Sequence, residues 1–269
     1  MIGPYPILCR GHSGGRVVCE AFMRNGIRMG RVSEKQKDSM FFSIRQNKNI
    51  RQIILAAYDY LNGDAATRNR LQTLMRETVM EFLEKEIQHD GPFGWKIDPT
   101  LFTMPVVLDA FPTAKVVHLI RDGRDVMLSR LNARMERLND PVNKLMVFGD
   151  SNVDAFDGQP LTPETIEKFR NELEMLHWVT SVQYGLLGRK YEDRYLEVKY
   201  EDICLAPIAT FEKIFDFTGT PFLPETREWL TGAVSPGRIG KWESLPPETL
   251  ARPLAIGGEL LRALGYVND

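Results

Sequence analysis

Cysteine, long apolar runs and excess charge of either sign are all scarce in this sequence of 269 residues. The three cysteines, Cys9, Cys19 and Cys204, are too few and too scattered for a disulfide framework or a zinc site. No apolar stretch approaches the ~20 residues that a membrane-spanning helix requires. We therefore predict no membrane span and no metal site.

The sequence also lacks features that are typical of secreted proteins. It contains no Asn-x-Ser/Thr glycosylation acceptor. Its short apolar beginning carries no basic residue before Arg10, unlike a signal peptide. These absences favour a cytoplasmic protein. The alternative is a lumenal enzyme whose anchor lies outside this sequence.

The charge balance and the composition limit the class of protein further. Lysine and arginine total 34 against 36 aspartate and glutamate, so the formal net charge is −2. A protein that binds nucleic acid through general electrostatics is usually more basic, so we predict no nucleic-acid partner. The 43% hydrophobic and 26% charged fractions are those of an ordinary globular protein. Since an α/β fold often uses this length as one domain, we predict a single domain over residues 1–269.

The order of the apolar segments predicts the fold class. Residues 5–10 predict a buried strand, which is followed by a glycine loop and an amphipathic helix. Residues 115–120 are β-branched and almost continuously apolar, which is typical of a central parallel strand. Further strands are expected at 93–97 and 194–199, and helices at 67–88, 165–188 and 207–217. This alternation predicts an α/β fold of three layers, a central parallel sheet with helices on both faces.

Glycines separate the first predicted strand from the first predicted helix, in the run Arg10-Gly11-His12-Ser13-Gly14-Gly15-Arg16. Such a loop lets backbone N–H groups converge, and the helix N-terminus adds partial positive charge, so the loop suits an anion. A tight turn that needs glycine for its geometry is the alternative. The loop does not match the G-x-x-x-x-G-K-[ST] pattern of magnesium-dependent nucleotide sites, because Arg16 replaces the lysine and Val17 the hydroxyl residue. This difference favours a phosphate site that works without a metal.

A second anion site is predicted in the run HLIRDGRDVMLS. Arg121 follows the predicted central strand, at the sheet edge where ligands of open α/β sheets bind. Its guanidinium and the hydroxyl of Ser129 suit a second phosphate. We interpret Asp122 and Asp125, with the neighbouring arginines, as surface ion pairs around a helix start. His118, inside the predicted strand, is interpreted as a packed core residue.

Four motifs, in this order, resemble those of the sulfotransferases that use 3′-phosphoadenosine 5′-phosphosulfate (PAPS). PILCRGHSGGRVV resembles the 5′-phosphosulfate loop of that family, and AKVVHLIRDGRDVMLS closely resembles its 3′-phosphate motif. KYED, at 199–202, is similar to a Y-E-D segment of the family, and RIGKW, at 238–242, to its R-x-G-x-W element. The motifs span residues 6–242. The resemblance implies a P-loop NTPase-like sulfotransferase fold that uses PAPS, releases adenosine 3′,5′-bisphosphate (PAP) and needs no metal.

The resemblance also implies roles for the residues of these motifs. The 5′-phosphosulfate would be held by the loop, namely Gly11, His12, Ser13, Gly14, Gly15 and Arg16. The 3′-phosphate would be bound by Arg121 and Ser129. Arg238 and Gly240 would close over the nucleotide from the C-terminal element. Tyr200 would lie near the adenine or would be a purely structural residue at the end of a strand.

The sequence departs from the family pattern at His12, where lysine or arginine is common. Two neighbouring anions would raise the pKa of His12 above the reference of ~6.5, so His12 is still a candidate for charge at the leaving group. Three carboxylates compete as general base. Asp98 follows Lys96 where the family's cytosolic branch has a K-x-H histidine base, which would make Lys96 a contact to the sulfuryl oxygen. Asp38 lies where other branches place a carboxylate base, and Glu20 is the weakest candidate. The alternative for each is a solvated surface carboxylate.

The resemblance implies an enzyme that transfers the sulfuryl group of PAPS to a hydroxyl or amine of an unidentified acceptor. The acceptor classes are a small molecule, a glycan and a lipid. Residues 28–66, which are basic, and 139–163, which are polar and lack a convincing period, are expected to shape its pocket, the latter as a lid or mobile segment. Two alternatives stay open: a P-loop nucleotide kinase that requires magnesium, and a non-catalytic module that binds PAP or PAPS.

Overall fold

The computed structural model describes residues 3–88, 90–129 and 138–267. Contacts within the chain divide it into two units. Unit 1 comprises Met1–Ile120 and Tyr184–Pro236, and unit 2 comprises Arg121–Gln183 and Gly237–Asp269. That the whole chain forms a single domain stays a prediction.

Unit 1 is built on a parallel sheet of three strands within the described residues, β1 (Ile7–Cys9), β2 (Val116–Ile120) and β5 (Tyr195–Lys199). The order is β1-β2-β5, so β2 lies in the centre, as its apolar sequence predicts. Because the strands are parallel, their carboxyl ends meet at one edge of the sheet. The glycine loop, Arg121 and Tyr200 are the residues that follow these three ends. The predicted α/β class is confirmed.

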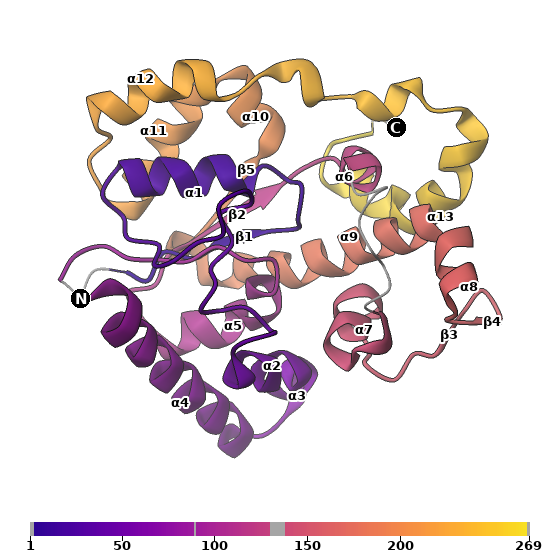
Figure 1. Cartoon of the computed structure of the whole chain (residues 1–269), viewed down its shortest axis with the longest axis horizontal. Helices are drawn as coiled ribbons and strands as arrows, with labels where there is room; N and C mark the ends of the chain where they lie inside the picture. Colours follow the sequence, from indigo (N-terminus) through magenta and orange to yellow (C-terminus); the bar gives the residue numbers. More distant parts are fainter. Residues whose placement is uncertain (1–2, 89, 130–137, 268–269) are drawn as a thin grey trace. The chain divides into compact units, whose positions relative to one another are not determined.

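Helices cover both faces of this sheet, which confirms the predicted three layers. In Figure 1, one side of the sheet carries α1 (Gly15–Arg24), α11 (Pro207–Thr218) and α12 (Pro224–Ala233). The other side carries α4 (Ala65–Phe82), which continues as a π-helical turn (Leu83–Ile87), and α5 (Thr100–Ala110). The remaining α-helices of unit 1 in the described residues are α2 (Lys48–Leu55), α3 (Ala57–Asn62) and α10 (Tyr200–Leu205).

β1 is shorter than the strand predicted over residues 5–10, and proline is one reason. The carbonyls of Pro4 and Pro6 accept hydrogen bonds from Lys115 and Val117, but neither proline has an N–H to return. The regular ladder with β2 therefore begins at Ile7.

The prediction of a strand over residues 93–97 is wrong. This segment does run beside β1. The carbonyl of Phe93 accepts a hydrogen bond of 2.8 Å from Tyr5 N–H, and that of Trp95 one of 2.9 Å from Ile7 N–H. Its other edge contacts Arg28 and Ser39, which belong to a loop and not to a strand. The result is a set of isolated bridges, and an extended segment that is fixed beside β1.

Unit 2 is mostly helical. Its described α-helices and strands are α6 (Gly123–Ser129), α7 (Pro141–Phe148), the strands β3 (Ala155–Phe156) and β4 (Gln159–Pro160), α8 (Pro163–Lys168), most of α9 (Arg170–Leu186) and α13 (Pro247–Ala263), and a 3₁₀ turn spans Lys241–Ser244. The strands β3 and β4 pair antiparallel. One buried apolar cluster joins Leu138, Val147, Ile166, Phe169 and Leu173.

Residues 139–163 contain more regular structure than the lack of a convincing apolar period indicates, and their role as a lid or mobile segment stays a prediction. The side chain of Asp140 caps α7 by accepting a hydrogen bond of 2.8 Å from Val142 N–H, and Pro141 occupies the first turn. Gly149 ends the helix with a φ of 74°. Capping residues, which a search for apolar periodicity does not weigh, therefore define this short helix.

His118 is a core residue, as predicted. Its side chain is fully buried, and Nδ1 lies 2.6 Å from the hydroxyl oxygen of Tyr195. Burial lowers the pKa of His118 to about 4, so the ring is neutral at neutral pH. Gly185 of α9 packs directly against this ring, since a Cβ at Gly185 would lie 2.2 Å from Cε1.

We expect Gly185→Ala to destabilise the protein by about 1–3 kcal/mol, because the added methyl group overpacks the site beside His118. Gly232→Ala in α12 is the matched control, since a Cβ there meets nothing within 4 Å. This control is expected to gain roughly 0.5–1 kcal/mol from the better helix propensity of alanine. Urea unfolding measures both changes, and equal effects of the two variants would contradict the packing described for Gly185.

Candidate functional site

The loop between β1 and α1 is a tight turn whose geometry requires glycine. Ser13 N–H donates to the carbonyl of Arg10 at 3.1 Å, and His12 and Gly14 have φ values of 70° and 86°. A Cβ at Gly14 would lie 2.3 Å from Cδ2 of Tyr200, which is buried against the loop. Tyr200 therefore has a packing role here, whatever else it contacts.

The first turn of α1 is suited to an anion by its charges. It contains no acidic residue, and the helix N-terminus carries partial positive charge. Arg16 is exposed in this turn, His12 is exposed in the loop before it, and Ser13 is buried. The structure thus brings the predicted loop residues together around one helix start.

Lys96 lies against this same helix start. A Cβ at Gly15 would come within 2.8 Å of Cε of Lys96 and 2.5 Å of Sγ of Cys9, so a larger residue does not fit. The ammonium of Lys96 is buried, and its Nζ donates to Oδ1 of Asp38 at 2.5 Å and to the carbonyl of Gln36 at 3.0 Å. Two predicted catalytic residues, Lys96 and Asp38, are therefore direct partners.

The charge of Lys96 survives its burial. Burial opposes the charged form, but the surrounding negative charge, which at neutral pH is that of the carboxylates of Asp38 and Asp98, raises the pKa of Lys96 above its ordinary value. Cys9 itself is neutral at pH 7, because burial raises the pKa of its thiol to about 12. The site beside α1 thus holds a buried ammonium ion at neutral pH.

Asp98 holds the beginning of the glycine loop. Its Oδ2 accepts a hydrogen bond of 2.9 Å from Gly11 N–H and one of 3.1 Å from Nη1 of Arg10. The side chain of Arg10 is only 2% exposed and is thus removed from water, whereas that of Asp98 is 26% exposed. Sequence reasoning named Asp98 as a candidate base but did not foresee its bonds to the loop.

Arg121 is the first residue of unit 2 and is buried. Its Nη2 donates to the carbonyl of Arg238 at 2.6 Å, and its own carbonyl accepts from Nε1 of Trp178 at 3.0 Å. Nη2 also lies 3.4 Å from Oδ2 of Asp125. The predicted phosphate ligand is therefore positioned by three parts of unit 2.

The prediction that the acidic residues beside Arg121 form surface ion pairs is wrong, because these side chains are buried. Asp125 is 1% exposed and accepts hydrogen bonds from the N–H groups of Gly240 (2.9 Å) and Trp242 (3.2 Å). Asp122 is 6% exposed and pairs with Arg124 at 2.7 Å. The hydrogen bonds to Asp125 come from backbone N–H groups of a segment that is distant in sequence, and no local sequence pattern indicates such a contact.

The other predicted nucleotide ligands of unit 2 are less enclosed. Ser129 is the last residue of α6 and is half-buried. Arg238 is exposed at the end of a 3₁₀ turn (Pro236–Arg238), and Gly240 has a φ of 71°. Arg238 and Gly240 belong to one network with Arg121 and Asp125, whereas no contact among the described residues of unit 2 joins Ser129 to it.

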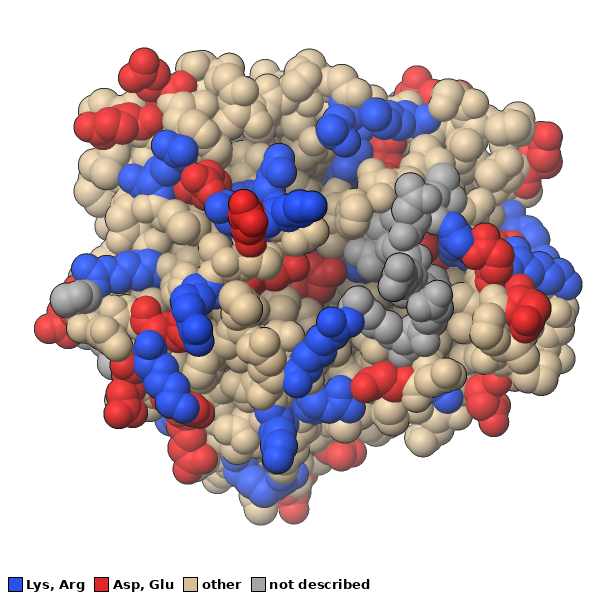
Figure 2. All heavy atoms as spheres, viewed as in Figure 1, with Lys and Arg blue, Asp and Glu red and all other residues tan. Residues whose placement is uncertain are grey.

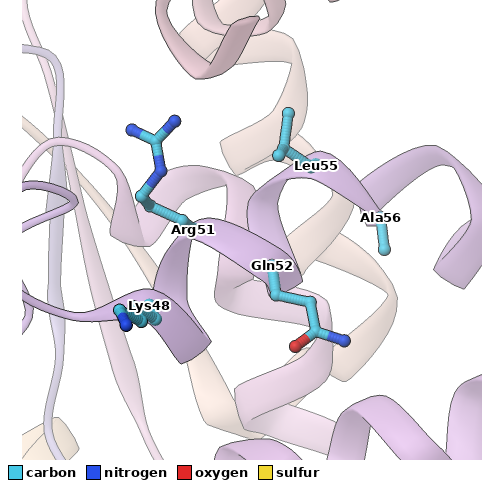
Figure 3. A pocket seen from close by; sticks show the side chains of 5 residues that line it. All are labelled: Lys48, Arg51, Gln52, Leu55 and Ala56. Atoms are coloured by element: carbon cyan, nitrogen blue, oxygen red, sulfur yellow. The ribbon is translucent and has the colours of Figure 1, made fainter.

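The predicted acceptor segment 28–66 carries a hollow of about 440 Å³ on α2. It is lined by Lys48, Arg51, Gln52, Leu55 and Ala56 (Figure 3). Several Lys and Arg side chains gather over this region in the space-filling view (Figure 2). Part of the predicted basic character is neutralised, since Arg31 pairs with Glu86 at 2.7 Å.

Two absences apply to the described residues, 3–88, 90–129 and 138–267. No cluster of three or more His, Cys, Asp and Glu side chains there is arranged to hold a metal ion. No helix in the same ranges has both the length and the apolar character to cross a membrane.

Comparison with known proteins identifies the family. The sequence model described as "Sulfotransferase family" matches residues 28–224, almost three quarters of the chain. This chain belongs to the sulfotransferase family. The match contains Lys96, Asp98 and Arg121, but the glycine loop and Arg238 lie outside it, so their assignment rests on their geometry and on the sequence motifs.

Curated relatives of this sulfotransferase are similar over part of their length. Carbohydrate sulfotransferase 3 of Tetronarce californica is 29% identical over 130 residues, which cover 48% of this chain and 27% of that protein. Carbohydrate sulfotransferase 4 of Mus musculus is 26% identical over 184 residues, which cover 61% of this chain and 45% of that protein. The chain thus matches less than half the length of either relative.

Solved structures confirm the predicted sulfotransferase fold. The sulfotransferase domain from the Synechococcus PCC 7002 olefin synthase is similar with a TM-score of 0.58 and 18% identity, covering 100% of this chain and 98% of that one. The sulfotransferase domain from the curacin biosynthetic pathway is similar with a TM-score of 0.54 and 16% identity, covering 97% of this chain and 98% of that one. At these identities the likeness concerns the fold alone.

The role of Asp98 in holding the loop is testable through stability. Asp98→Ala removes the acceptor of Gly11 N–H and of the Arg10 guanidinium, and we expect it to cost about 1–3 kcal/mol. Asp98→Asn retains one acceptor oxygen and is expected to cost less. Urea unfolding of both, with the exposed Asp193→Ala as control, measures this difference. A loss in Asp98→Ala no larger than in the control would contradict the role assigned to Asp98.

Proposed function

We propose that this sulfotransferase transfers the sulfuryl group of PAPS to a hydroxyl or amine of an acceptor and releases PAP. The observation that supports it best is the buried ammonium of Lys96 beside the start of α1, a helix without acidic residues in its first turn. Family membership supplies the reaction class. The PAPS donor, the roles of single residues and the acceptor are part of the proposal.

The glycine loop is the proposed site of the 5′-phosphosulfate. Backbone N–H groups of Gly14 and Gly15, the hydroxyl of Ser13 and the guanidinium of Arg16 are the donors that fit such an anion. In the transfer, the bond between sulfur and the 5′-phosphate oxygen breaks while a bond from sulfur to the acceptor forms. Lys96 would stabilise negative charge on the sulfuryl or bridging oxygen, and His12 would supply charge at the departing phosphate.

The 3′-phosphate is assigned to the guanidinium of Arg121 and the hydroxyl of Ser129, since a planar fork and a hydroxyl suit a phosphate. Arg238 and Gly240 would contribute from the C-terminal element. Tyr200 keeps two roles in the proposal, packing against Gly14 and contact with the base of the nucleotide.

Asp38 is our assignment for the general base. Of the two leading candidates, Asp98 already accepts a hydrogen bond from the glycine loop through Oδ2. The side chain of Asp38 is 35% exposed, so an acceptor can reach it, and it is paired with Lys96. The acceptor's proton would pass to Asp38 as the new bond to sulfur forms. Asp98 then acts by holding the loop, and not by taking a proton.

A glycan is the acceptor class that the relatives favour, because both are named carbohydrate sulfotransferases. Lys48 and Arg51 on the α2 hollow would suit an acidic sugar chain. Small-molecule and lipid acceptors are the alternatives that an acceptor screen must include. A cytoplasmic location likewise stays a prediction, with a lumenal one as the alternative.

Nucleotide binding separates this proposal from the kinase alternative. We expect PAP, without magnesium, to raise the melting temperature, because a ligand at ~100 times its dissociation constant adds about 2.7 kcal/mol to the stability of the native state. ADP is expected to stabilise less, and Arg121→Ala to remove the advantage of PAP. Stabilisation by ATP with magnesium but not by PAP would refute the proposal.

The base assignment predicts different kinetics for two carboxylate variants. Asp38→Asn is expected to lower kcat roughly 10²–10⁴-fold, the contribution typical of general base catalysis, while the protein still binds PAP. Asp98→Asn is expected to weaken nucleotide binding, with a smaller change in kcat. Steady-state release of PAP measures both. If Asp98→Asn abolishes turnover while Asp38→Asn is active, the two roles are reversed.

A further inference from the structure

Asp125 lies in the first turn of α6, where an aspartate is usually explained by the helix dipole. Its carboxylate instead accepts hydrogen bonds from a segment that is distant in sequence. Oδ2 accepts from Gly240 N–H at 2.9 Å and Oδ1 from Trp242 N–H at 3.2 Å. Both oxygens of a side chain that is 1% exposed are thus bonded to the backbone of the 238–242 segment.

The same carboxylate is the charge partner of Arg121. Oδ2 lies 3.4 Å from Nη2 of Arg121, and that nitrogen also donates to the carbonyl of Arg238 at 2.6 Å. The guanidinium and the 238–242 segment are therefore fixed to each other twice, once directly and once through Asp125. A buried guanidinium must be held in one orientation to present its fork to an anion, and Asp125 is one of the groups that hold that of Arg121.

A second contact, which does not involve Arg121, also holds the 238–242 segment. The guanidinium carbon of Arg124 lies 3.5 Å from the ring centroid of Trp242. Arg124 also pairs with Asp122 at 2.7 Å and donates to the carbonyl of Tyr266 at 2.8 Å. Replacing the carboxylate of Asp125 by an amide would therefore leave one acceptor oxygen for the two N–H groups of the segment and remove the charge that faces Arg121, while Trp242 keeps this independent support.

We propose that Asp125 is a positioning residue that aligns Arg121 with the 238–242 segment and thereby sets the preference of this protein for nucleotides with a 3′-phosphate. The inference rests on the proposed function, because it needs a 3′-phosphate at Arg121. Asp125 acts through Arg121 and the backbone of Gly240, and not by contact with the nucleotide. Its removal therefore affects the 3′-phosphate contact and leaves the 5′ end of the nucleotide unaffected.

The test is the ratio of the affinities for PAP and for adenosine 5′-monophosphate, which lacks the 3′-phosphate, measured by calorimetry without magnesium. In Asp125→Asn we expect the affinity for PAP to fall tenfold or more and that for the monophosphate to change less than twofold. Glu243→Gln, which neutralises an exposed carboxylate of the neighbouring turn, is the control and is expected to leave both affinities unchanged.

A second variant keeps the inference testable if Asp125→Asn does not fold. Gly240→Ala leaves the carboxylate in place, but alanine is strained at the φ of 71° that Gly240 adopts. The strain displaces the N–H group that donates to Asp125. It is expected to show the same selective loss of PAP affinity. Equal losses for both nucleotides, or an unchanged ratio in a folded variant, would overturn the inference.

The outcomes also separate this inference from the proposed function. If the unmodified protein prefers PAP and Asp125→Asn keeps that preference, only the role of Asp125 is wrong. If the unmodified protein binds PAP no better than the monophosphate, the proposed function fails and the role of Asp125 falls with it.

Discussion

The glycine loop depends on one carboxylate, that of Asp98, which holds the loop's first N–H group and the buried guanidinium of Arg10. Lys96 lies in a segment that runs beside β1, and Asp98 lies in the turn that follows it. This short stretch of chain therefore delivers both an ammonium ion to the start of α1 and an anchor to the glycine loop. The absence of a regular strand at 93–97 leaves this placement intact.

Unit 2 uses a carboxylate in a similar way. Asp125 accepts two backbone N–H groups of the 238–242 segment and faces Arg121. In both units, a buried or half-buried aspartate thus fixes backbone beside a buried arginine. Burying a carboxylate costs free energy that only several hydrogen-bond donors together can offset. Such carboxylates therefore mark positions at which the chain is held in place.

The parts of the fold that local sequence determines were predictable. β2 is a continuous buried run, and the glycine loop follows an apolar strand, so the sheet edge that carries both candidate sites could be located from the sequence. The short helix α7 was missed because its caps, and not its period, define it. The partners of Asp98 and Asp125 were missed because they join residues about 90 to 115 positions apart, and no local pattern encodes such a contact.

The central claim is that the buried ammonium beside α1 serves sulfuryl transfer from PAPS. The most direct measurement is mass spectrometry of a panel of glycan, lipid and small-molecule acceptors after incubation with PAPS and the protein. We expect a sulfated acceptor and an equal amount of PAP, both reduced roughly 10²–10³-fold in Lys96→Ala, the loss expected when one charge-stabilising donor is removed. Sulfation at an undiminished rate in Lys96→Ala, or no sulfated acceptor from a protein that binds PAP, would contradict it.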